Sequence, residues 1–294
     1  MDQNILRLLP VYFTEACEKD RKIGKSIQEI YFRIGQPILC VSNEGEYYIS
    51  TEGGFCKVDE RKKGIVCENR EMEQIIERIT GYSLYAYREQ LKNGYMILPG
   101  GSRLGVAGEA FLSDENKIQY RCITYLVIRL AHQIIGCAEE LMKNLGTEFK
   151  NTLLVSPPGG GKTTMLRDMI RILSNRGYRV SLIDERGEVA GAYQGAPQLD
   201  IGMRTSVMTG CKKGMGMEHA VRCMSPEIIA ADEVGANEDL KAMNYALLSG
   251  CKILCTVHGN SLEDIRNKGI EGFKQIVFLR REGKSFFYEV ERLT

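Results

Sequence analysis

The sequence predicts an α/β protein in which a smaller α+β domain precedes a domain with a mostly parallel sheet and helices on both of its faces. Three observations indicate this organisation. In the first half, short stretches of alternating apolar and polar residues are separated by turn-forming residues, which is typical of hairpins. In the second half, short and continuously apolar stretches alternate with helical periodicity, and a glycine-rich loop joins one of them to a helix. We expect an N-terminal domain over residues 1–135 and a second domain over residues 136–294.

The composition is that of an ordinary globular protein, with 44% hydrophobic and 26% charged residues. The 39 basic and 38 acidic residues leave a net charge of +1, so the chain has no strong positive field with which to hold a nucleic acid or an acidic membrane by net charge alone. Its ten cysteines include no Cys-x-x-Cys pair, which disfavours a zinc site. No apolar stretch approaches the ~18 residues of a membrane-spanning helix. We therefore expect a cytoplasmic protein that contacts a membrane only through its partners.

In the first 135 residues, apolar residues first recur at helical spacing and then alternate with polar residues, which predicts a helix followed by strands. A helix over residues 1–24 is expected to break at Pro10, because proline removes a backbone donor. The other elements expected here are strands at 27–34, 38–41 and 47–49, a helix at 71–80, a second helix at 84–92, two strands joined by a glycine-rich turn within 95–111, and a strand region at 119–130.

Four apolar stretches of the second half are expected to form the parallel sheet. Each is short and is bounded by glycine or charged residues, as buried parallel strands usually are. They lie at 152–155, 179–183, 228–231 and 253–257. Open parallel sheets bind ligands outside the carboxyl ends of their strands, so the residues that follow these stretches are the candidates for function.

The sequence Ser-Pro-Pro-Gly-Gly-Gly-Lys-Thr-Thr at residues 156–164 follows the first of these strands and opens a helix. A strand, a glycine loop, Gly-Lys-Thr and a helix in this order predict a P-loop, in which backbone N–H groups surround a phosphate that no Cβ keeps away. Lys162 is expected to reach the β- and γ-phosphates of ATP, and the Thr163 hydroxyl to bind Mg²⁺. The motif begins with Ser156 where glycine is usual. The residues predicted to bind the nucleotide here are Pro158, Gly159, Gly160, Gly161, Lys162, Thr163 and Thr164.

Two pairs of carboxylates follow two of the other strands. Asp232 and Glu233 follow the strand at 228–231, and Asp184 and Glu185 follow the strand at 179–183. Hydrolysis of ATP needs one acid that holds the metal and a base that orients the attacking water. We assign Asp232 to Mg²⁺ and Glu233 to the base. If the two strands are neighbours, both pairs meet in one crevice, so Glu185 is an alternative base.

One histidine and three arginines complete the predicted site. His258 ends the fourth strand, on the same edge as the acids, where it can sense the γ-phosphate or a neighbouring subunit. Arg204 lies between the acidic pairs in the sequence, and Arg121 and Arg129 lie shortly before the expected domain boundary. Each arginine is a candidate arginine finger, which accelerates phosphoryl transfer by roughly 10³ to 10⁵. We assign His258 and Arg204 to catalysis and Arg121 and Arg129 to nucleotide binding.

In their order, these motifs resemble the secretion ATPases, the P-loop motors of type II and type IV secretion and of pilus retraction. The last motif, Ala-Leu-Leu-Ser-Gly-Cys-Lys-Ile-Leu-Cys-Thr-Val-His at 246–258, is similar to that group's histidine box, in which a small-residue helix, a glycine and a strand lead to Thr-x-His. The resemblance implies a RecA-like second domain, Mg²⁺-dependent hydrolysis of ATP, and a homo-hexamer with ATP at the subunit interfaces. We class the chain with the AAA+ ATPases.

Other segments resemble the stage III sporulation protein AA family over most of the chain. They are Phe-Arg-Ile-Gly-Gln-Pro at 32–37, Leu-Pro-Gly-Gly-Ser-Arg-Leu-Gly-Val-Ala-Gly at 98–108, Asp-Glu-Arg-Gly-Glu-Val-Ala-Gly at 184–191 and Arg-Cys-Met-Ser-Pro-Glu-Ile-Ile at 222–229. The resemblance implies an ATPase in the mother-cell cytoplasm that energises or assembles the channel to the forespore during endospore formation, with the membrane proteins of that channel as partners. The alternatives are a pilus or type II secretion motor outside sporulation, a nucleic-acid-dependent motor, and a nucleotide-binding scaffold without turnover.

Overall fold

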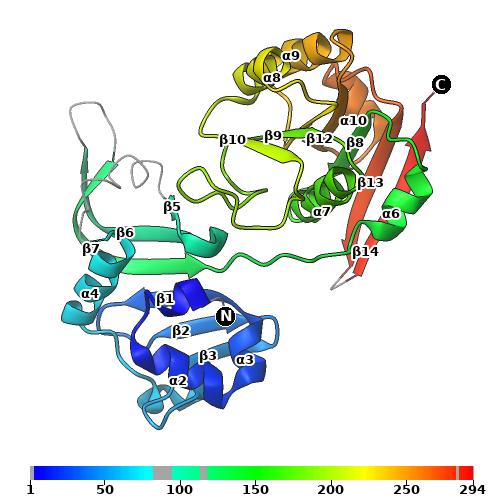
Figure 1. Cartoon of the computed structure of the whole chain (residues 1–294). Helices are drawn as coiled ribbons and strands as arrows, with labels where there is room; N and C mark the ends of the chain where they lie inside the picture. Colours follow the sequence, from blue (N-terminus) through cyan, green and yellow to red (C-terminus); the bar gives the residue numbers. More distant parts are fainter. Residues whose placement is uncertain (1–2, 82–94, 113–117, 283–284, 294) are drawn as a thin grey trace. The chain divides into compact units, whose positions relative to one another are not determined.

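The structure is a computed structural model of the chain, and it describes residues 3–81, 95–112, 118–282 and 285–293 (Figure 1). The chain divides into two units, Met1–His132 and Gln133–Thr294, each with its own sheet and its own buried core. The helix expected at 84–92 lies outside the described residues.

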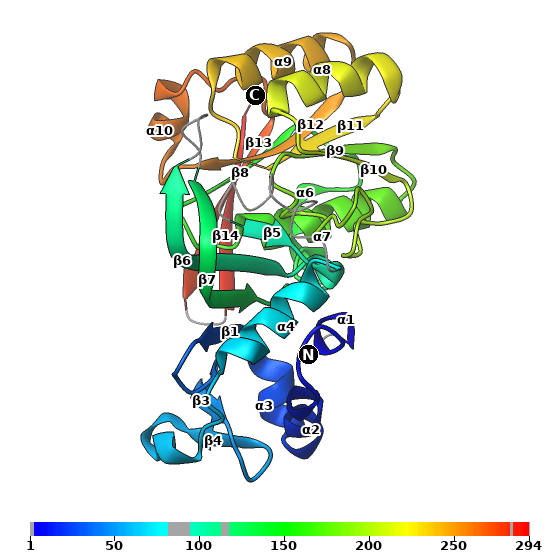
Figure 2. The ribbon, with the colours of Figure 1, turned by 90° about the vertical axis from the view of Figure 1, so that its left-hand side faces the viewer.

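Three short helices open the N-terminal unit, whereas a single break at Pro10 predicts two. They are α1 (Gln3–Leu6), α2 (Val11–Lys19) and α3 (Arg21–Ser26), and Figure 2 shows them together on one side of the unit's sheet. The additional break lies at Asp20, whose φ of −121° and ψ of 68° are not helical. The inner faces of the helices contribute to the buried core of the unit. This burial stabilises them, because helices of this length do not persist alone in water.

The sheet of the N-terminal unit is antiparallel, and its described strands lie in the order β4-β3-β2-β1-β7-β6-β5. Its strands are β1 (Ile27–Arg33), β2 (Leu39–Ser42), β3 (Gly45–Ile49), β4 (Phe55–Lys57), β5 (Tyr95–Ile97), β6 (Arg103–Leu112) and β7 (Ile118–Arg129). The predicted strands are present, and the predicted helix is α4 (Asn69–Ile79). Strand β4 and the 3₁₀ turns η1 (Val58–Lys63) and η3 (Pro99–Gly101) are too short for a pattern to predict them.

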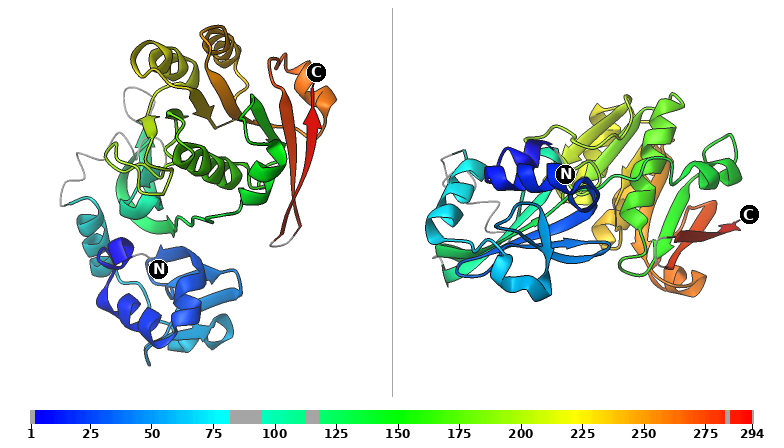
Figure 3. Two further views of the ribbon diagram at one scale, coloured as in Figure 1. Left: turned by 45° about the vertical axis from the view of Figure 1, so that its right-hand side comes forward. Right: turned by 90° about the horizontal axis from the view of Figure 1, so that it is seen from below.

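The sheet of the C-terminal unit has its described strands in the order β10-β9-β11-β12-β8-β13-β14. All neighbours are parallel except β13 and β14, which form the antiparallel ribbon drawn in orange and red in Figure 3. The strands are β8 (Thr152–Ser156), β9 (Val180–Asp184), β10 (Thr205–Thr209), β11 (Ile228–Ala231), β12 (Lys252–His258), β13 (Gln275–Glu282) and β14 (Ser285–Arg292). The four predicted strands are β8, β9, β11 and β12, and these occupy the middle of the sheet.

Helices cover both faces of this sheet (Figure 1). On one face, α6 (Glu139–Leu145) and α7 (Lys162–Asn175) share a core cluster with alternate strand residues. On the other face, α8 (Lys213–Cys223), α9 (Asn237–Leu248) and α10 (Leu262–Asn267) share a second core cluster with the strand residues that point to that face. Because both faces are buried, the inner strands are continuously apolar. The predicted fold class is confirmed. No helix in the described part of the chain is long and apolar enough to cross a membrane.

Candidate active site

The carboxyl ends of four adjacent parallel strands collect most of the predicted site residues. In the sheet, β9, β11, β12 and β8 are neighbours in this order. Asp184 and Glu185 end the first, Asp232 and Glu233 the second and His258 the third, and the P-loop follows the fourth. Parallel strands end at a common edge of the sheet, so segments far apart in the sequence meet there.

The loop between β8 and α7 has the backbone that a phosphate-binding loop requires. Gly159 and Gly161 have φ angles of 74° and 88°, a region that residues with a Cβ disfavour. Gly160 lies directly against Ser156, because a Cβ on Gly160 would come within 2.2 Å of Ser156 Oγ. Ser156 is buried, and its hydroxyl donates to the carbonyl oxygen of Pro157 at 2.9 Å. The Ser156 side chain, which is unusual at this position of the motif, has room because residue 160 is glycine.

Lys162 is the first residue of α7, and its side chain is almost wholly buried. Its Nζ donates to the carbonyl oxygens of Ser156 and Pro157 at 3.0 and 3.2 Å and to Nδ1 of His258 at 3.0 Å. Burial lowers the pKa of Lys162, and the carboxylates that follow β11 oppose this effect. The amine is thus held within the loop. It lies beside the N-terminus of α7, whose helix dipole also favours an anion at this place.

Asp232 connects the P-loop helix to the neighbouring strand. Its Oδ2 accepts a hydrogen bond from the Thr163 hydroxyl at 2.9 Å, and its Oδ1 accepts one from the hydroxyl of Thr256 in β12. A hydroxyl beside a carboxylate suits Mg²⁺, which is usually bound by one or two protein oxygens together with water and phosphate oxygens. Among the described residues no group of three or more His, Cys, Asp or Glu side chains can hold a metal by itself. Thr163 and Asp232 therefore fit a Mg²⁺ ion that arrives with a phosphorylated ligand.

Glu233 has a backbone conformation that is rare for a residue other than glycine, with a φ of 42°. Its N–H donates to Thr256 Oγ1 at 2.5 Å, and the next N–H, of Val234, donates to the Thr256 carbonyl oxygen at 2.9 Å. In this conformation Oε1 of Glu233 lies 2.8 Å from Nε2 of His258. Since the other ring nitrogen of His258 contacts Lys162, the imidazole bridges the carboxylate and the P-loop amine.

Asp184 holds together the loop that follows β9, residues 184–190, which we call the acidic box. Its side chain is buried, and its two oxygens accept hydrogen bonds from the backbone N–H groups of Glu188, Val189 and Ala190 at 2.9, 3.2 and 2.9 Å. Burial raises the pKa of Asp184, while the three N–H groups favour its charged form. The Asp184 carboxylate is thus fully engaged by the loop that follows it, so Glu185 is the member of this pair that remains a candidate base.

The two carboxylate pairs do line one small cavity, as neighbouring strands require. Asp184, Glu185, Asp232 and Glu233 all contribute to it, together with Lys213 at the start of α8. Glu185 forms an ion pair with Lys213, with Oε2 and Nζ 3.0 Å apart. The charge of Glu185 is thus compensated by an ammonium group, whereas the partner of Glu233 is an imidazole.

The three predicted arginines each contact residues of their own unit that lie outside the P-loop. Arg204 immediately precedes β10, and its Nη1 donates to the carbonyl oxygen of Gly177, just beyond the last residue of α7. The P-loop lies at the other end of α7, ~20 Å away for a helix of this length. Arg121 and Arg129 lie on β7 in the N-terminal unit, each paired with a glutamate of the same sheet at 3.2 and 3.1 Å.

Three further residues contribute to the site without being predicted. Thr256 positions both members of the Asp232–Glu233 pair, and its signal is its place two residues before His258, because alternate strand residues share a face. Arg167 of α7 is buried and donates to two carbonyl oxygens of the acidic-box loop, which ties this loop to the P-loop helix. The ring of Phe286 in β14 lies against Gly161, and no local pattern indicates this contact.

The fold of this chain is similar to that of the RecA-like secretion ATPases of known structure. The structure of the pilus retraction motor PilT with bound ADP matches with a TM-score of 0.64, at 13% identity, over 95% of this chain and 83% of that one. The ATPase DotB of Legionella pneumophila matches with a TM-score of 0.59, at 16% identity, over 97% and 81%. At these identities the similarity concerns the fold alone. The assignment to the AAA+ ATPases is wrong, because the secretion ATPases are a different class.

The chain belongs to the family of sporulation stage III, protein AA, whose sequence model matches residues 1–285. The stage III sporulation protein AA of Bacillus subtilis is 34% identical over 249 residues, which are 82% of this chain and 76% of the relative. A weaker similarity, 28% over 168 residues, reaches the uncharacterized protein ycf45 of Porphyra purpurea, covering 56% of this chain and 30% of that protein.

Proposed function

We propose that this protein hydrolyses ATP in a Mg²⁺-dependent reaction. The observation that carries the proposal is the continuous set of contacts at one sheet edge, in which His258 bridges Lys162 of the P-loop and Glu233. Thr163 and Asp232 lie in direct contact beside it. Phosphate-binding backbone, a metal-binding oxygen pair and a carboxylate base are the three parts that hydrolysis of a nucleoside triphosphate requires.

Each part has a role in the proposed reaction. The N–H groups of Gly159–Thr163 and the amine of Lys162 bind the phosphates and stabilise the negative charge that develops on them. Mg²⁺, held by Thr163 and Asp232, supplies further neutralisation of that charge. Glu233 accepts a hydrogen bond from the attacking water and orients it. His258 fixes the direction of the Glu233 carboxylate.

The contacts favour Glu233 over Glu185 as the base. Glu233 follows β11, which only β12 separates from the P-loop strand, whereas two strands separate β9 and Glu185 from it. Glu185 also pairs with Lys213 of α8 at 3.0 Å, whereas Glu233 contacts His258, which itself contacts Lys162 of the P-loop.

Turnover and binding measurements on three variants test the proposal. Lys162→Ala should abolish ATP hydrolysis with an unchanged thermal unfolding midpoint, and near-normal hydrolysis in this variant would refute the proposal. Glu233→Gln should bind ATP and fail to hydrolyse it, while Glu185→Gln should keep most of the activity. The reverse result for the two glutamine variants would move the base to the acidic box and leave the ATPase function standing.

We further propose that the protein acts in the mother-cell cytoplasm as a homo-hexamer that energises or assembles the channel to the forespore, together with membrane proteins of that channel. Membership in the sporulation family supports the process, and the fold shared with the PilT motor supports the mode of action. We place the arginine finger at a subunit interface, with Arg204, Arg121 and Arg129 as its candidates. Molar mass measured with and without ATP, beside a single-turnover assay, tests the assembly, and a monomer under both conditions would contradict it.

A further inference from the structure

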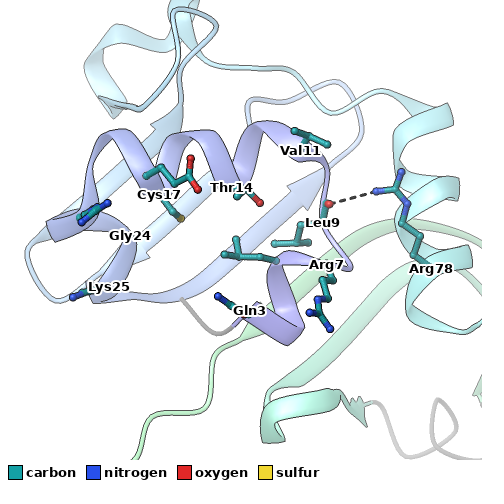
Figure 4. Close-up of a pocket in the computed structure, with 12 residues that line it drawn as sticks. Gln3, Arg7, Leu9, Val11, Thr14, Cys17, Gly24, Lys25 and Arg78 are labelled. Atoms are coloured by element: carbon teal, nitrogen blue, oxygen red, sulfur yellow. Dashed lines mark hydrogen bonds between the residues drawn. The ribbon is translucent and has the colours of Figure 1, made fainter.

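A pocket of about 630 Å³ opens among the first helices of the N-terminal unit (Figure 4). Its lining comes from α1, α2, α3, the residues between them and Arg78 of α4. None of these residues belongs to the P-loop site, and all lie in the same unit. The volume is within the ~300–1,000 Å³ that is typical of ligand sites.

The lining of this pocket is strongly basic. Its described residues include Arg7, Arg21, Lys25 and Arg78 and a single acid, Glu18, which gives an excess of three positive charges among them in a chain with a net charge of +1. Among the described residues, no acid forms an ion pair with any of the four cations. Clustered and uncompensated cations beside a concave surface attract anionic groups.

A neighbouring cation shows that this lack of partners is local. Lys22 lies on the same helix as Lys25 but outside the pocket, and its Nζ is 3.2 Å from a carboxylate oxygen of Glu44. Arg78 at the other side of the pocket uses one N–H to bond the carbonyl oxygen of Leu9 at 3.3 Å. This bond fixes Arg78 over the pocket without neutralising its charge.

Between the cations the pocket is aliphatic. Leu6, Leu9 and Val11 contribute to the lining, and Val11 is 71% exposed although it is large and apolar. In Figure 4, Leu9 lies between Lys25 on one side and Arg78 on the other. Helices α2 and α3 approach closely at Gly24, where a Cβ would come within 3.0 Å of Cys17.

We infer that this pocket binds an acidic, aliphatic segment of a partner protein. Its leucine-like side chains enter between Leu6, Leu9 and Val11, and its carboxylates pair with the cations around them. None of the described residues that line the pocket is aromatic, which disfavours a nucleotide base, because bases are usually held by stacking. A membrane surface is also disfavoured, because the apolar residues Phe13 and Ala16 of α2 are buried in the core, which leaves Val11 as the one large apolar residue that this helix exposes.

The test begins with a random 12-residue peptide library, displayed on phage and selected on the full-length chain. The expected consensus combines Asp or Glu with Leu, Ile or Val, and the synthetic consensus peptide is the probe. A charge reversal within the pocket, Lys25→Glu, should weaken its binding about 3- to 10-fold. The double variant Arg21→Glu with Lys25→Glu should weaken it further. Failure to enrich any acidic peptide would overturn the inference.

Lys22→Glu is the matched control, since it makes the same charge change on the same helix outside the pocket. It should bind the peptide as the unmodified chain does, and equal losses in Lys22→Glu and Lys25→Glu would overturn the inference. Circular dichroism confirms that each variant is folded. Val11→Asp, which tests the apolar part separately, should also weaken binding.

Two further measurements separate this site from its alternatives. Co-sedimentation with phosphatidylglycerol vesicles should be unaffected by Lys25→Glu, and a loss specific to this variant would assign the pocket to a membrane surface instead. The inference does not depend on the proposed ATPase function, so Lys162→Ala should bind the peptide normally. A loss in that variant would contradict an independent site, whatever its effect on hydrolysis.

Discussion

The backbone N–H of Glu233 donates a hydrogen bond to the hydroxyl of Thr256 at 2.5 Å, so the neighbouring strand β12 determines the conformation of the proposed base. The same hydroxyl donates to Asp232, and the Thr256 carbonyl oxygen accepts from Val234. A positive φ at a residue other than glycine costs about 1–3 kcal/mol and persists only where surrounding contacts enforce it. Thr256 supplies these contacts, and is therefore a positioning residue for both carboxylates.

Replacing Thr256 with valine should reduce turnover by about 10- to 100-fold, the usual effect of losing a partner that orients a metal ligand. The substitution keeps the shape of the side chain and leaves the Glu233 N–H and one Asp232 oxygen without their partner. The affinity for ATP should change little, because the P-loop is untouched. Steady-state hydrolysis as a function of Mg²⁺ concentration, with nucleotide binding measured separately, gives both quantities.

Thr256→Ser is the control, since it retains the hydroxyl and loses only a methyl group. It should keep turnover within about threefold of the unmodified chain, in line with an effect that depends on the hydroxyl. If Thr256→Val hydrolyses ATP normally at saturating Mg²⁺, Thr256 does not position the carboxylates.

Asp184→Asn should destabilise the protein although it removes a buried charge. Burial raises the pKa of Asp184, so the charge itself is unfavourable in the fold. An amide, however, replaces one accepting oxygen with a donor that faces backbone N–H groups of Glu188, Val189 or Ala190. An unsatisfied buried donor costs about 1–3 kcal/mol, which is the expected fall in the free energy of unfolding at neutral pH by urea titration. A more stable variant would show that the cost of burying the charge is the larger effect.

The same carboxyl group should also make stability depend on pH. Because its folded pKa is raised above the ordinary 3.8, the folded chain binds more protons than the unfolded chain between these two values. The part of the stability that comes from this protonation is therefore complete below pH 3.8 and is lost as the pH rises through the folded pKa, while the hydrogen bonds to the loop remain. The free energy of unfolding of the unmodified chain, minus that of Asp184→Asn, should fall across this range and level off above it. A difference that rises with pH would mean that the N–H groups lower the pKa overall.

The inner strands of the parallel sheet were predictable because a strand that is buried on both faces consists of a continuous run of mostly apolar residues. Strands β8, β9, β11 and β12 are of this kind, and the residues that end them carry the site. The edge strand β14 alternates between exposed and partly buried residues, and β10 is only partly buried, so neither strand has a continuous apolar run by which it could be predicted. In the same way, no residue type marks the helix break at Asp20.

What sequence reasoning could not supply is the contact between elements. The pairing of Ala231 with Cys255 sets which β12 residue faces Glu233, and only this register brings the Thr256 hydroxyl to it. The ion pair between Glu185 and Lys213 likewise joins a strand end to a later helix. Arg204 shows that nearness in the sequence can also mislead. It lies between the two acidic pairs in the sequence, but in the structure it lies at the opposite edge of the sheet, where β10 begins.

Gly160→Ala should destabilise the P-loop through lack of space alone. Its φ is not among the positive values of the chain, so alanine can adopt its backbone conformation. The new Cβ would nevertheless come within 2.2 Å of Ser156 Oγ and 2.8 Å of Ser156 Cβ. Adding Ser156→Gly removes both atoms and restores the usual glycine of the motif. The double variant should recover most of the stability lost in Gly160→Ala, a coupling of about 1–3 kcal/mol in a thermal unfolding cycle. Additive effects would contradict the contact.

Gly161→Ala should behave differently, because this glycine is required for two reasons. A Cβ would meet Cε1 of Phe286 at 2.2 Å, and the φ of 88° disfavours any side chain. Phe286→Ala removes the first obstacle and leaves the second, which costs roughly 1–2 kcal/mol for an L-residue. The double variant should therefore recover only part of the stability, and its affinity for ATP should stay weak, because the backbone N–H groups of the loop are turned away from the phosphates. Unfolding midpoints and ATP titrations of the two single variants and the double variant measure this. Full recovery of both quantities would show that Phe286, and not the left-handed backbone, is what requires glycine at this position.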